Sequence, residues 1–143
     1  AYMEKEREQA TKKNYPDPIQ KDKQATDNDF TKAIEYCIEN IKTVSLCAGT
    51  HNEKSILHLI DLMKKSSLKN NDSRICFAQL LGMSDHISYN LSEQGYNVAK
   101  YVPYGPIKEV IPYLIRRAKE NTSVSGQTGR ELSLIKIELE NRN

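Results

Sequence analysis

The stretch "TVSLCAGTHNEKSILHLIDLMKK", residues 43–65, decides the fold of this chain. It begins with a short apolar segment, residues 43–50, whose β-branched start and length predict a buried strand. A polar peptide follows. Residues 52–65 then place Ile56, Leu59, Ile60 and Met63 on one face of a helix. A strand followed directly by an amphipathic helix is the repeating unit of parallel α/β proteins.

The same unit recurs toward the C-terminus. Two more strands are predicted, at residues 74–81 and 97–102. Each is followed by a predicted helix, the first at residues 84–95 and the second at residues 105–121. Ser84 is the expected N-cap of the first of these helices, and Gly95 its stop. A doubly wound sheet and a (βα)8 barrel both fit this alternation. No GxGxxG motif or P-loop favours the doubly wound choice.

The flanks of this α/β region are helical as well. Residues 4–13 are helix-prone, two prolines break the chain at residues 14–19, and an apolar stripe from Thr26 predicts a further helix. Residues 1–143 are expected to form one domain, with 122–143 as a linker and a C-terminal helix. Because the sequence starts without Met and runs straight into helical sequence, we expect it to belong to a longer protein.

Composition excludes several functions. At 38% hydrophobic and 28% charged residues the chain is typical of a soluble globular domain. A net charge of +2 gives no electrostatic case for nucleic acid or an anionic membrane. The scattered Cys37, Cys47 and Cys76 predict reduced thiols, the last two in the core. His58 and His86 lie in predicted helices without ligand spacing, so no metal site is expected.

A distinctive peptide follows each predicted strand. These peptides are "THNE" (50–53), "QLLGM" (79–83) and "YVPYG" (101–105). Because the carboxyl ends of parallel strands share one edge, the three peptides predict one shared pocket. The alternative is purely local: Thr50 caps the following helix, and His51 and Asn52 are polar loop residues.

The last predicted helix ends in "YLIRRAKEN", residues 113–121. Tyr113, Arg117 and Glu120 share one flank at i, i+4 and i+7, whereas Arg116 points away from the apolar stripe. One interpretation is a solvated, charged flank. The other is a pair of guanidinium groups that binds a carboxylate, because the planar fork of arginine matches the two carboxylate oxygens.

Taken together, "YPDPI", "THNE", "QLLGM", "KYVPYG" and "YLIRRAKEN" closely resemble the C-terminal half of the proline dehydrogenase family, monofunctional type. The resemblance covers residues 1–121 and continues more loosely to the end. It implies the C-terminal half of a distorted (βα)8 barrel, from about strand five or six to helix eight. The family binds FAD, oxidises L-proline to Δ1-pyrroline-5-carboxylate and passes electrons to a membrane quinone. The 143-residue chain alone is expected to be inactive, since half of the barrel is missing.

The resemblance also implies roles for single residues. Arg116 and Arg117 bind the proline carboxylate, which for Arg116 requires the helix to cross the barrel mouth. The remaining substrate-binding residues are Leu80, Tyr101, Tyr113, Tyr2 and Glu120, the last holding the arginines. The residues that contact the flavin are Ala1, Thr50, His51, Asn52 and Gln79. No catalytic acid or base and no metal ligand is assigned within this chain.

The expected partners are L-proline and a membrane quinone, without nucleic acid and with peripheral membrane association. The expected location is the bacterial cytoplasm or the inner face of the inner membrane, or the mitochondrial inner membrane or matrix. Hydroxyproline dehydrogenase is the alternative in the same family. Such enzymes tend to carry a smaller residue in place of Tyr101, so Tyr101 favours proline. A non-catalytic α/β fragment is the other alternative, and a yellow flavin colour would distinguish it.

Overall fold

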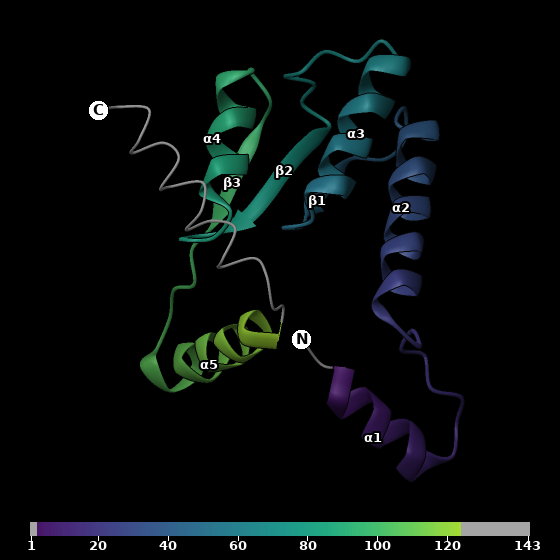
Figure 1. The fold of residues 1–143 in the computed structure, drawn as a ribbon, viewed down its shortest axis with the longest axis vertical. Coiled ribbons are helices and arrows are strands. Elements are labelled where there is room, and N and C mark those ends of the chain that lie inside the picture. Colours follow the sequence, from purple (N-terminus) through teal and green to yellow (C-terminus); the bar gives the residue numbers. More distant parts are fainter. Residues whose placement is uncertain (1–2, 124–143) are drawn as a thin grey trace. The chain divides into compact units, whose positions relative to one another are not determined.

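The computed structural model describes residues 3–123, which form two compact units (Figure 1). One unit spans residues 3–102 and contains the sheet. The other begins at Pro103 and contains the last described helix. None of the helices within residues 3–123 is long and apolar enough to cross a membrane.

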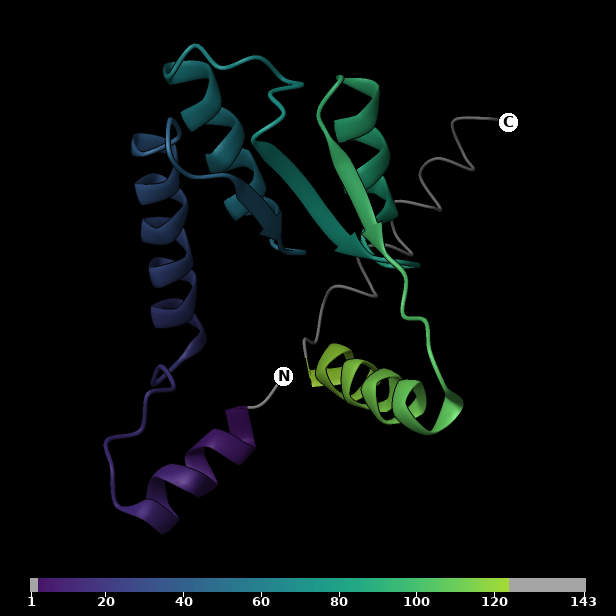
Figure 2. The same ribbon diagram turned by 180° about the vertical axis from the view of Figure 1, so that it is seen from behind.

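The sheet has three parallel strands in the order β1-β2-β3. The strands are β1 (Leu46–Gly49), β2 (Ile75–Leu80) and β3 (Val98–Tyr101). Helix α3 (Glu53–Lys65) connects the first pair, and α4 (Asp85–Glu93) connects the second (Figure 2). The register pairs Phe77 of β2 with Ala48 on one side and with Val98 on the other. The predicted alternation of parallel strands and helices is therefore confirmed.

Both connecting helices cover the same face of the sheet. Their apolar stripes join the buried strand residues in one core, and these helices and strands contribute Ala48, Ile56, Leu59, Met63, Ile75, Phe77, Ile87 and Leu91 to it. The strand order also follows the chain order. A doubly wound sheet reverses its order and carries helices on both faces. The winding is therefore that of a (βα) barrel, which separates the two folds that the sequence left open.

The opposite face of the sheet carries no helix of this unit. Strand side chains alternate, so Cys47 and Cys76, which are partners in the register, both point to this face. The prediction that both belong to the core is wrong, since Cys47 is exposed and Cys76 half-buried. Partial burial, reinforced by the adjacent Cys47, raises the pKa of the Cys76 thiol.

Helix α2 (Lys23–Glu39) packs beside α3 (Figure 1). It begins earlier than predicted because the Asp22 carboxylate accepts the Ala25 N–H as an N-cap. Ile34 and Ile38 enter the core. His58 of α3 lies 2.9 Å from the Glu35 carboxylate of α2, so it connects the two helices.

Strand β1 is shorter than the predicted strand 43–50. The N–H groups of Thr43 and Val44 donate to the Asn40 carbonyl at 2.9 and 3.1 Å. These β-branched residues therefore close the end of α2 instead of joining the sheet. Their β propensity is overridden because their N–H groups satisfy the free carbonyl at the helix end.

Two further helices flank the α/β region. Helix α1 (Met3–Lys13) confirms the predicted first helix and is tied to the proline-rich turn by Arg7 and Asp17, 3.6 Å apart. Helix α5 (Ile107–Ser123) starts after Pro106 and contains Pro112. It runs past the predicted end at 121, so Thr122 and Ser123 are not linker. Residues 124–143, with the remaining predicted linker and final helix, lie outside the described residues.

Arg74 braces the amino end of β2. Its guanidinium donates to the Asp72 carboxylate at 2.6 and 2.9 Å and to the Ile41 carbonyl at 3.2 Å. The hydrogen bonds from Arg74 lower the pKa of Asp72 to about 2. The interaction thus joins the loop before β2 to the end of α2.

The Asp72–Arg74 pair predicts a defined acid sensitivity. The pKa of Asp72 is depressed in the folded state, so its stabilisation is complete above its ordinary value of 3.8 and is lost as pH falls toward about 2. In the full-length protein, Asp72→Asn should lower the thermal midpoint near neutral pH, and the difference from wild type should narrow below about pH 4. The exposed Glu93→Gln serves as the control. A difference that stays constant down to about pH 2 would contradict the assignment.

Candidate functional site

Those parts of the three distinctive peptides that lie within residues 3–102 meet at the carboxyl edge of the sheet. The Thr50 N–H donates to the Ala78 carbonyl at 3.2 Å, and the Leu81 N–H donates to the Tyr101 carbonyl at 3.0 Å. Backbone hydrogen bonds thus carry the pairing past the end of each strand. The predicted clustering of the segments after the strands is confirmed for this part of the chain.

His51 connects the first two of these segments. Its Nδ1 lies 2.9 Å from Ser84 Oγ, and its Nε2 accepts the Leu80 N–H at 3.5 Å. A neutral imidazole has one acceptor and one donor nitrogen. Both ring nitrogens of His51 thus contact protein groups, one from the loop after β2 and one from the end of β2. His51 is therefore held in one orientation at the strand ends.

Ser84 takes the predicted N-cap position of α4 but does not act as a cap. Its side chain forms no capping hydrogen bond, and its φ of 51° lies in the left-handed region. A non-glycine residue in a sparsely populated backbone region costs about 1–3 kcal/mol unless its surroundings hold it there. Ser84 is buried and bonded to His51, so the loop conformation and the histidine orientation support each other.

Gln79 has its side chain on the helix-covered face of β2, where it is only 3% exposed. Its Nε2 donates to the Thr50 carbonyl at 3.3 Å, and its Oε1 accepts the Ser88 hydroxyl at 2.9 Å. The amide therefore links α4 to the peptide after β1. Contact between Gln79 and a flavin stays a prediction.

Asn52 supplies the N-cap of α3. Its Oδ1 accepts the Lys54 N–H at 3.0 Å, while Thr50 Oγ1 accepts the Asn52 N–H at 3.1 Å. The capping role that the sequence allowed for Thr50 thus belongs to Asn52. Thr50, His51 and Asn52 are each half-buried, and their contact with a cofactor stays a prediction.

The helix-free face is flat near this edge. Gly49, Ala78 and Ala99 are partners in the register, and their small side chains form a row across all three strands. One step further toward the edge, Leu80 is paired with Tyr101 on the same face. The row leaves room for a planar ring system beside the peptide 50–52. The residues present therefore fit the flavin that the family resemblance implies.

A histidine–carboxylate hydrogen bond and an ion pair brace the helix starts behind this edge. His86 Nε2 lies 3.0 Å from the Glu53 carboxylate, which connects α4 to α3. Lys100 of β3 lies 2.7 Å from the Asp85 carboxylate at the start of α4. The loops after β1 and β2 are thus fixed by side chains as well as by the sheet.

The other predicted substrate residues belong to the unit that contains α5. The Arg117 guanidinium lies 5.4 Å from the centre of the Tyr113 ring, within the range of a cation–π contact. Arg116, Arg117 and Tyr113 are half-buried. Glu120 lies in α5, but its side chain falls outside the described residues, as do Ala1 and Tyr2. Binding of a carboxylate by this helix stays a prediction.

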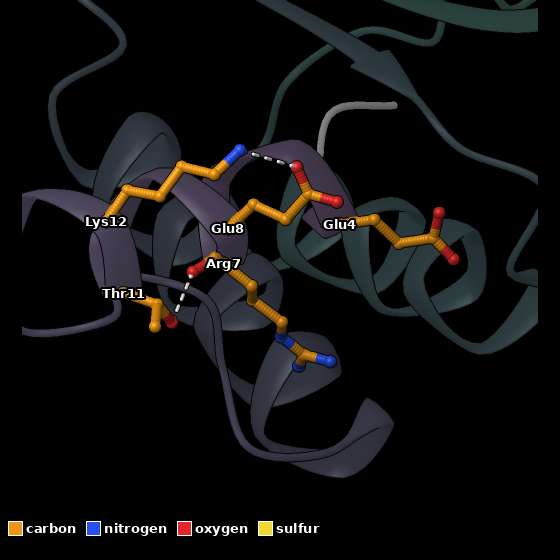
Figure 3. A pocket seen from close by; sticks show the side chains of 5 residues that line it. All are labelled: Glu4, Arg7, Glu8, Thr11 and Lys12. Atoms are coloured by element: carbon orange, nitrogen blue, oxygen red, sulfur yellow. Dashed lines mark hydrogen bonds and ion pairs between the residues drawn. The ribbon is translucent and has the colours of Figure 1, made fainter.

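A shallow hollow on the surface of α1 is lined by Glu4, Arg7, Glu8, Thr11 and Lys12 (Figure 3). All five residues lie on one helix. Lys12 pairs with Glu8 at 3.6 Å, and the Thr11 hydroxyl donates to the Arg7 carbonyl at 3.0 Å. These are ordinary contacts along an exposed helix, and the hollow lies outside the candidate site.

Residues 1–130 match the profile of a known family, described as proline dehydrogenase. The chain belongs to the proline dehydrogenase family. It is 38% identical to proline dehydrogenase 1, mitochondrial, of Drosophila melanogaster, over 99% of this chain and 22% of the relative. It is also 40% identical to the hydroxyproline dehydrogenase of Xenopus laevis, over 99% of this chain and 31% of the relative.

A solved structure shows the same likeness. Proline utilization A from Bdellovibrio bacteriovorus, inactivated by N-propargylglycine, superposes with a TM-score of 0.79 at 27% identity. The match covers 87% of this chain and 13% of that one. Together with the winding of the sheet it confirms the predicted α/β fold of the (βα)8-barrel type. This chain spans about a quarter of the length of the curated relatives named above.

Sequence reasoning missed three side chains that hold the edge of the sheet together: Ser84, Ser88 and Lys100. Ser84 and Ser88 stand four residues apart, so they share the buried face of α4. That spacing indicates the shared face of the two serines but not their hydrogen-bond partners. Lys100 alternates with Tyr101 along β3 and therefore points to the helix layer.

The buried Ser88–Gln79 hydrogen bond predicts a measurable loss of stability. Ser88→Ala in the full-length protein leaves the buried Gln79 carbonyl oxygen without this donor, at a cost of about 1–3 kcal/mol. Ser92→Ala on the exposed side of the same helix is the matched control, because both changes alter helix propensity equally. Urea unfolding of both variants measures the difference. Equal free energies of unfolding would show that the hydrogen bond contributes nothing.

Proposed function

We propose that this chain is part of an FAD-dependent enzyme that oxidises L-proline to Δ1-pyrroline-5-carboxylate. The observation that carries the proposal is the in-register pair of Leu80 and Tyr101 on the helix-free face, at the edge where His51 is fixed. In a member of the proline dehydrogenase family, these residues match the predicted substrate wall. The pair offers an aliphatic and an aromatic surface suited to a small saturated ring.

The cofactor site is proposed to include Thr50, His51, Asn52 and Gln79, with Ala1 contributing from the start of the chain. FAD supplies the two-electron acceptor chemistry when it is bound. The protein residues orient it: the fixed His51 and the half-buried hydroxyl and amide groups next to it provide hydrogen bonds at one edge of the sheet. The row of small residues beside them gives a flat surface for stacking.

Arg116 and Arg117 are proposed to bind the proline carboxylate, with Glu120 holding them. Two guanidinium groups can match the charge and the planar geometry of the carboxylate. Tyr113 supports Arg117 through its ring, because the guanidinium lies over it at 5.4 Å. Fixing the carboxylate limits the orientations of the proline ring. The other residues proposed to bind the substrate are Tyr2, Leu80, Tyr101 and Tyr113.

A membrane quinone is the proposed electron acceptor, reached by peripheral membrane association. The Drosophila relative and a human relative, 41% identical over 97% of this chain, are both named mitochondrial. We therefore propose the mitochondrial inner membrane or matrix as the location for this protein.

Hydroxyproline dehydrogenase is the second candidate, because relatives with that name are 40% identical to this chain. The two substrates differ by one hydroxyl group. Tyr101 is more than half exposed on the open face of the sheet, where its bulk is available to exclude that hydroxyl. Tyr101 therefore favours proline.

Replacement of the arginines tests the proposed function. In the full-length enzyme, Arg116→Met and Arg117→Met keep the side-chain stem and remove the charge. A hydrogen bond to a charged group contributes about 1.5–3 kcal/mol, so kcat/KM for proline should fall by about tenfold or more in each variant. Most of the loss should appear as a higher KM, since the carboxylate is bound in ground and transition states alike.

The exposed Lys108→Met on the same helix is the control for lost positive charge. Flavin absorbance measured beside the kinetics shows that the cofactor is retained. Near-normal KM values in both arginine variants would mean that Arg116 and Arg117 are surface charges. A full-length wild-type protein that carries no flavin or oxidises no proline would overturn the function itself.

The ratio of kcat/KM for hydroxyproline to kcat/KM for proline tests the proposed role of Tyr101. Tyr101→Ser removes the ring and should raise kcat/KM for hydroxyproline relative to proline, because space opens for the extra hydroxyl group. Tyr104→Ser, which changes a tyrosine that is 99% exposed, is the matched control. Steady-state kinetics with both substrates measures the ratio. An unchanged ratio in Tyr101→Ser would exclude this residue from the wall that distinguishes them.

A further inference from the structure

Lys100 stands next to Tyr101 in β3 and points to the other side of the sheet. Tyr101 is exposed on the helix-free face, whereas the Lys100 side chain is only 21% exposed. Neighbouring strand residues face opposite ways. The ammonium group therefore lies in the helix layer behind the residue proposed to contact the substrate.

The ammonium group contacts three acceptors from one continuous segment, residues 80–85. Lys100 Nζ donates to the Met83 carbonyl at 2.7 Å and to the Leu80 carbonyl at 3.5 Å. It also pairs with Asp85 Oδ1 at 2.7 Å. An ammonium has three donor hydrogens and no acceptor, so this environment suits it. The three acceptors come from the end of β2, the loop after it and the start of α4.

The loop that Lys100 holds is the loop that fixes His51. Ser84 follows Met83 directly, has a left-handed backbone and bonds His51 Nδ1 at 2.9 Å. Leu80, whose carbonyl accepts from Lys100, donates its own N–H to His51 Nε2. Displacement of the loop would therefore move both groups that orient the histidine. It would also shift Leu80 relative to its register partner Tyr101.

We propose that Lys100 is a positioning residue for the oxidation of proline: from behind the sheet it holds the loop 81–84, and thereby sets Leu80, Tyr101 and His51. The inference rests on the proposed function of these residues. Lys100 itself touches neither substrate nor cofactor. Its effect arises because displacement of the loop would shift Leu80 and Tyr101, which are proposed to contact the substrate, and would therefore weaken substrate binding.

An ordinary surface lysine provides the comparison. Lys65 pairs with Asp61 at 2.6 Å, but its side chain is 70% exposed, and the pair lies within one helix. Exposed pairs of this kind contribute little. The Lys100 ammonium instead joins β3 to two backbone carbonyls of another segment. Removal of each charge should therefore have different consequences for catalysis.

The test uses the full-length, flavin-loaded enzyme with Lys100→Met, Lys100→Gln and Lys100→Arg, and with Lys65→Met as the control. Lys100→Met should raise KM for proline by about tenfold, with a smaller change in kcat and flavin content retained. Lys100→Gln keeps one N–H donor group and should be intermediate. Lys100→Arg keeps the charge and several donors, so it should recover part of the loss. Lys65→Met should match wild type.

The outcomes separate this inference from the function on which it rests. A wild-type enzyme that oxidises no proline overturns the proposed function, and the positioning role with it. An active wild type with an unchanged KM in Lys100→Met overturns the positioning role alone. Should Lys100→Met fail to fold, the KM of folded Lys100→Gln decides, and a wild-type value there also overturns it. Equal losses in Lys100→Met and Lys100→Arg would indicate simple packing and overturn it too.

Discussion

The central strand β2 is the constraint on which the sheet-containing unit depends. It is paired in parallel with β1 over residues 75–78 and with β3 over residues 77–80, so it joins the other two strands into one sheet. Its inward residues Ile75 and Phe77 are almost completely buried, and Phe77 meets the Tyr96 ring edge-on at 5.5 Å. Helices α3 and α4 cover this one face, where their apolar stripes are buried against it. The opposite face carries the row of small residues Gly49, Ala78 and Ala99 and the pair of Leu80 and Tyr101, which is proposed to contact the substrate.

The two ends of β2 are held by different chemistry. At the amino end, Arg74 binds Asp72 and a carbonyl of the preceding helix region, an arrangement of charges on an otherwise generic loop. At the carboxyl end, hydrogen bonds of His51, Ser84 and Gln79 connect the segments that follow the strands. The charged Lys100 side chain donates to the same loop from the helix side. The carboxyl end has more side-chain hydrogen bonds than the amino end, because the segments that follow the strands carry more polar side chains. This difference matches the general placement of sites at the carboxyl ends of parallel strands.

Much of the fold could be predicted from periodicity. The helices around Ile56 and Leu59 and around Phe30 and Ile34 follow from apolar spacing, and the strand around Phe77 follows from a short apolar run. The face to which Cys47 points could not be predicted, because a four-residue strand gives no reliable phase. The grouping of the peptide at 50–52 with Leu80 and Tyr101 was predictable from strand polarity alone. The roles of Ser84 and Lys100 were not, since each depends on a contact between segments far apart in sequence.

The strand order has a consequence for how the unit is assembled during synthesis. Each strand pairs only with the strand that precedes or follows it in the chain, and each connecting helix covers the pair that it joins. β2 can therefore dock on β1 as soon as α3 has formed, and β3 can extend the sheet without separating strands that are already paired. Each pairing closes a loop that contains a single connecting helix, which costs less entropy than closing the longer loop between strands that are not consecutive. A growing chain can thus add the unit strand by strand in the order in which it leaves the ribosome.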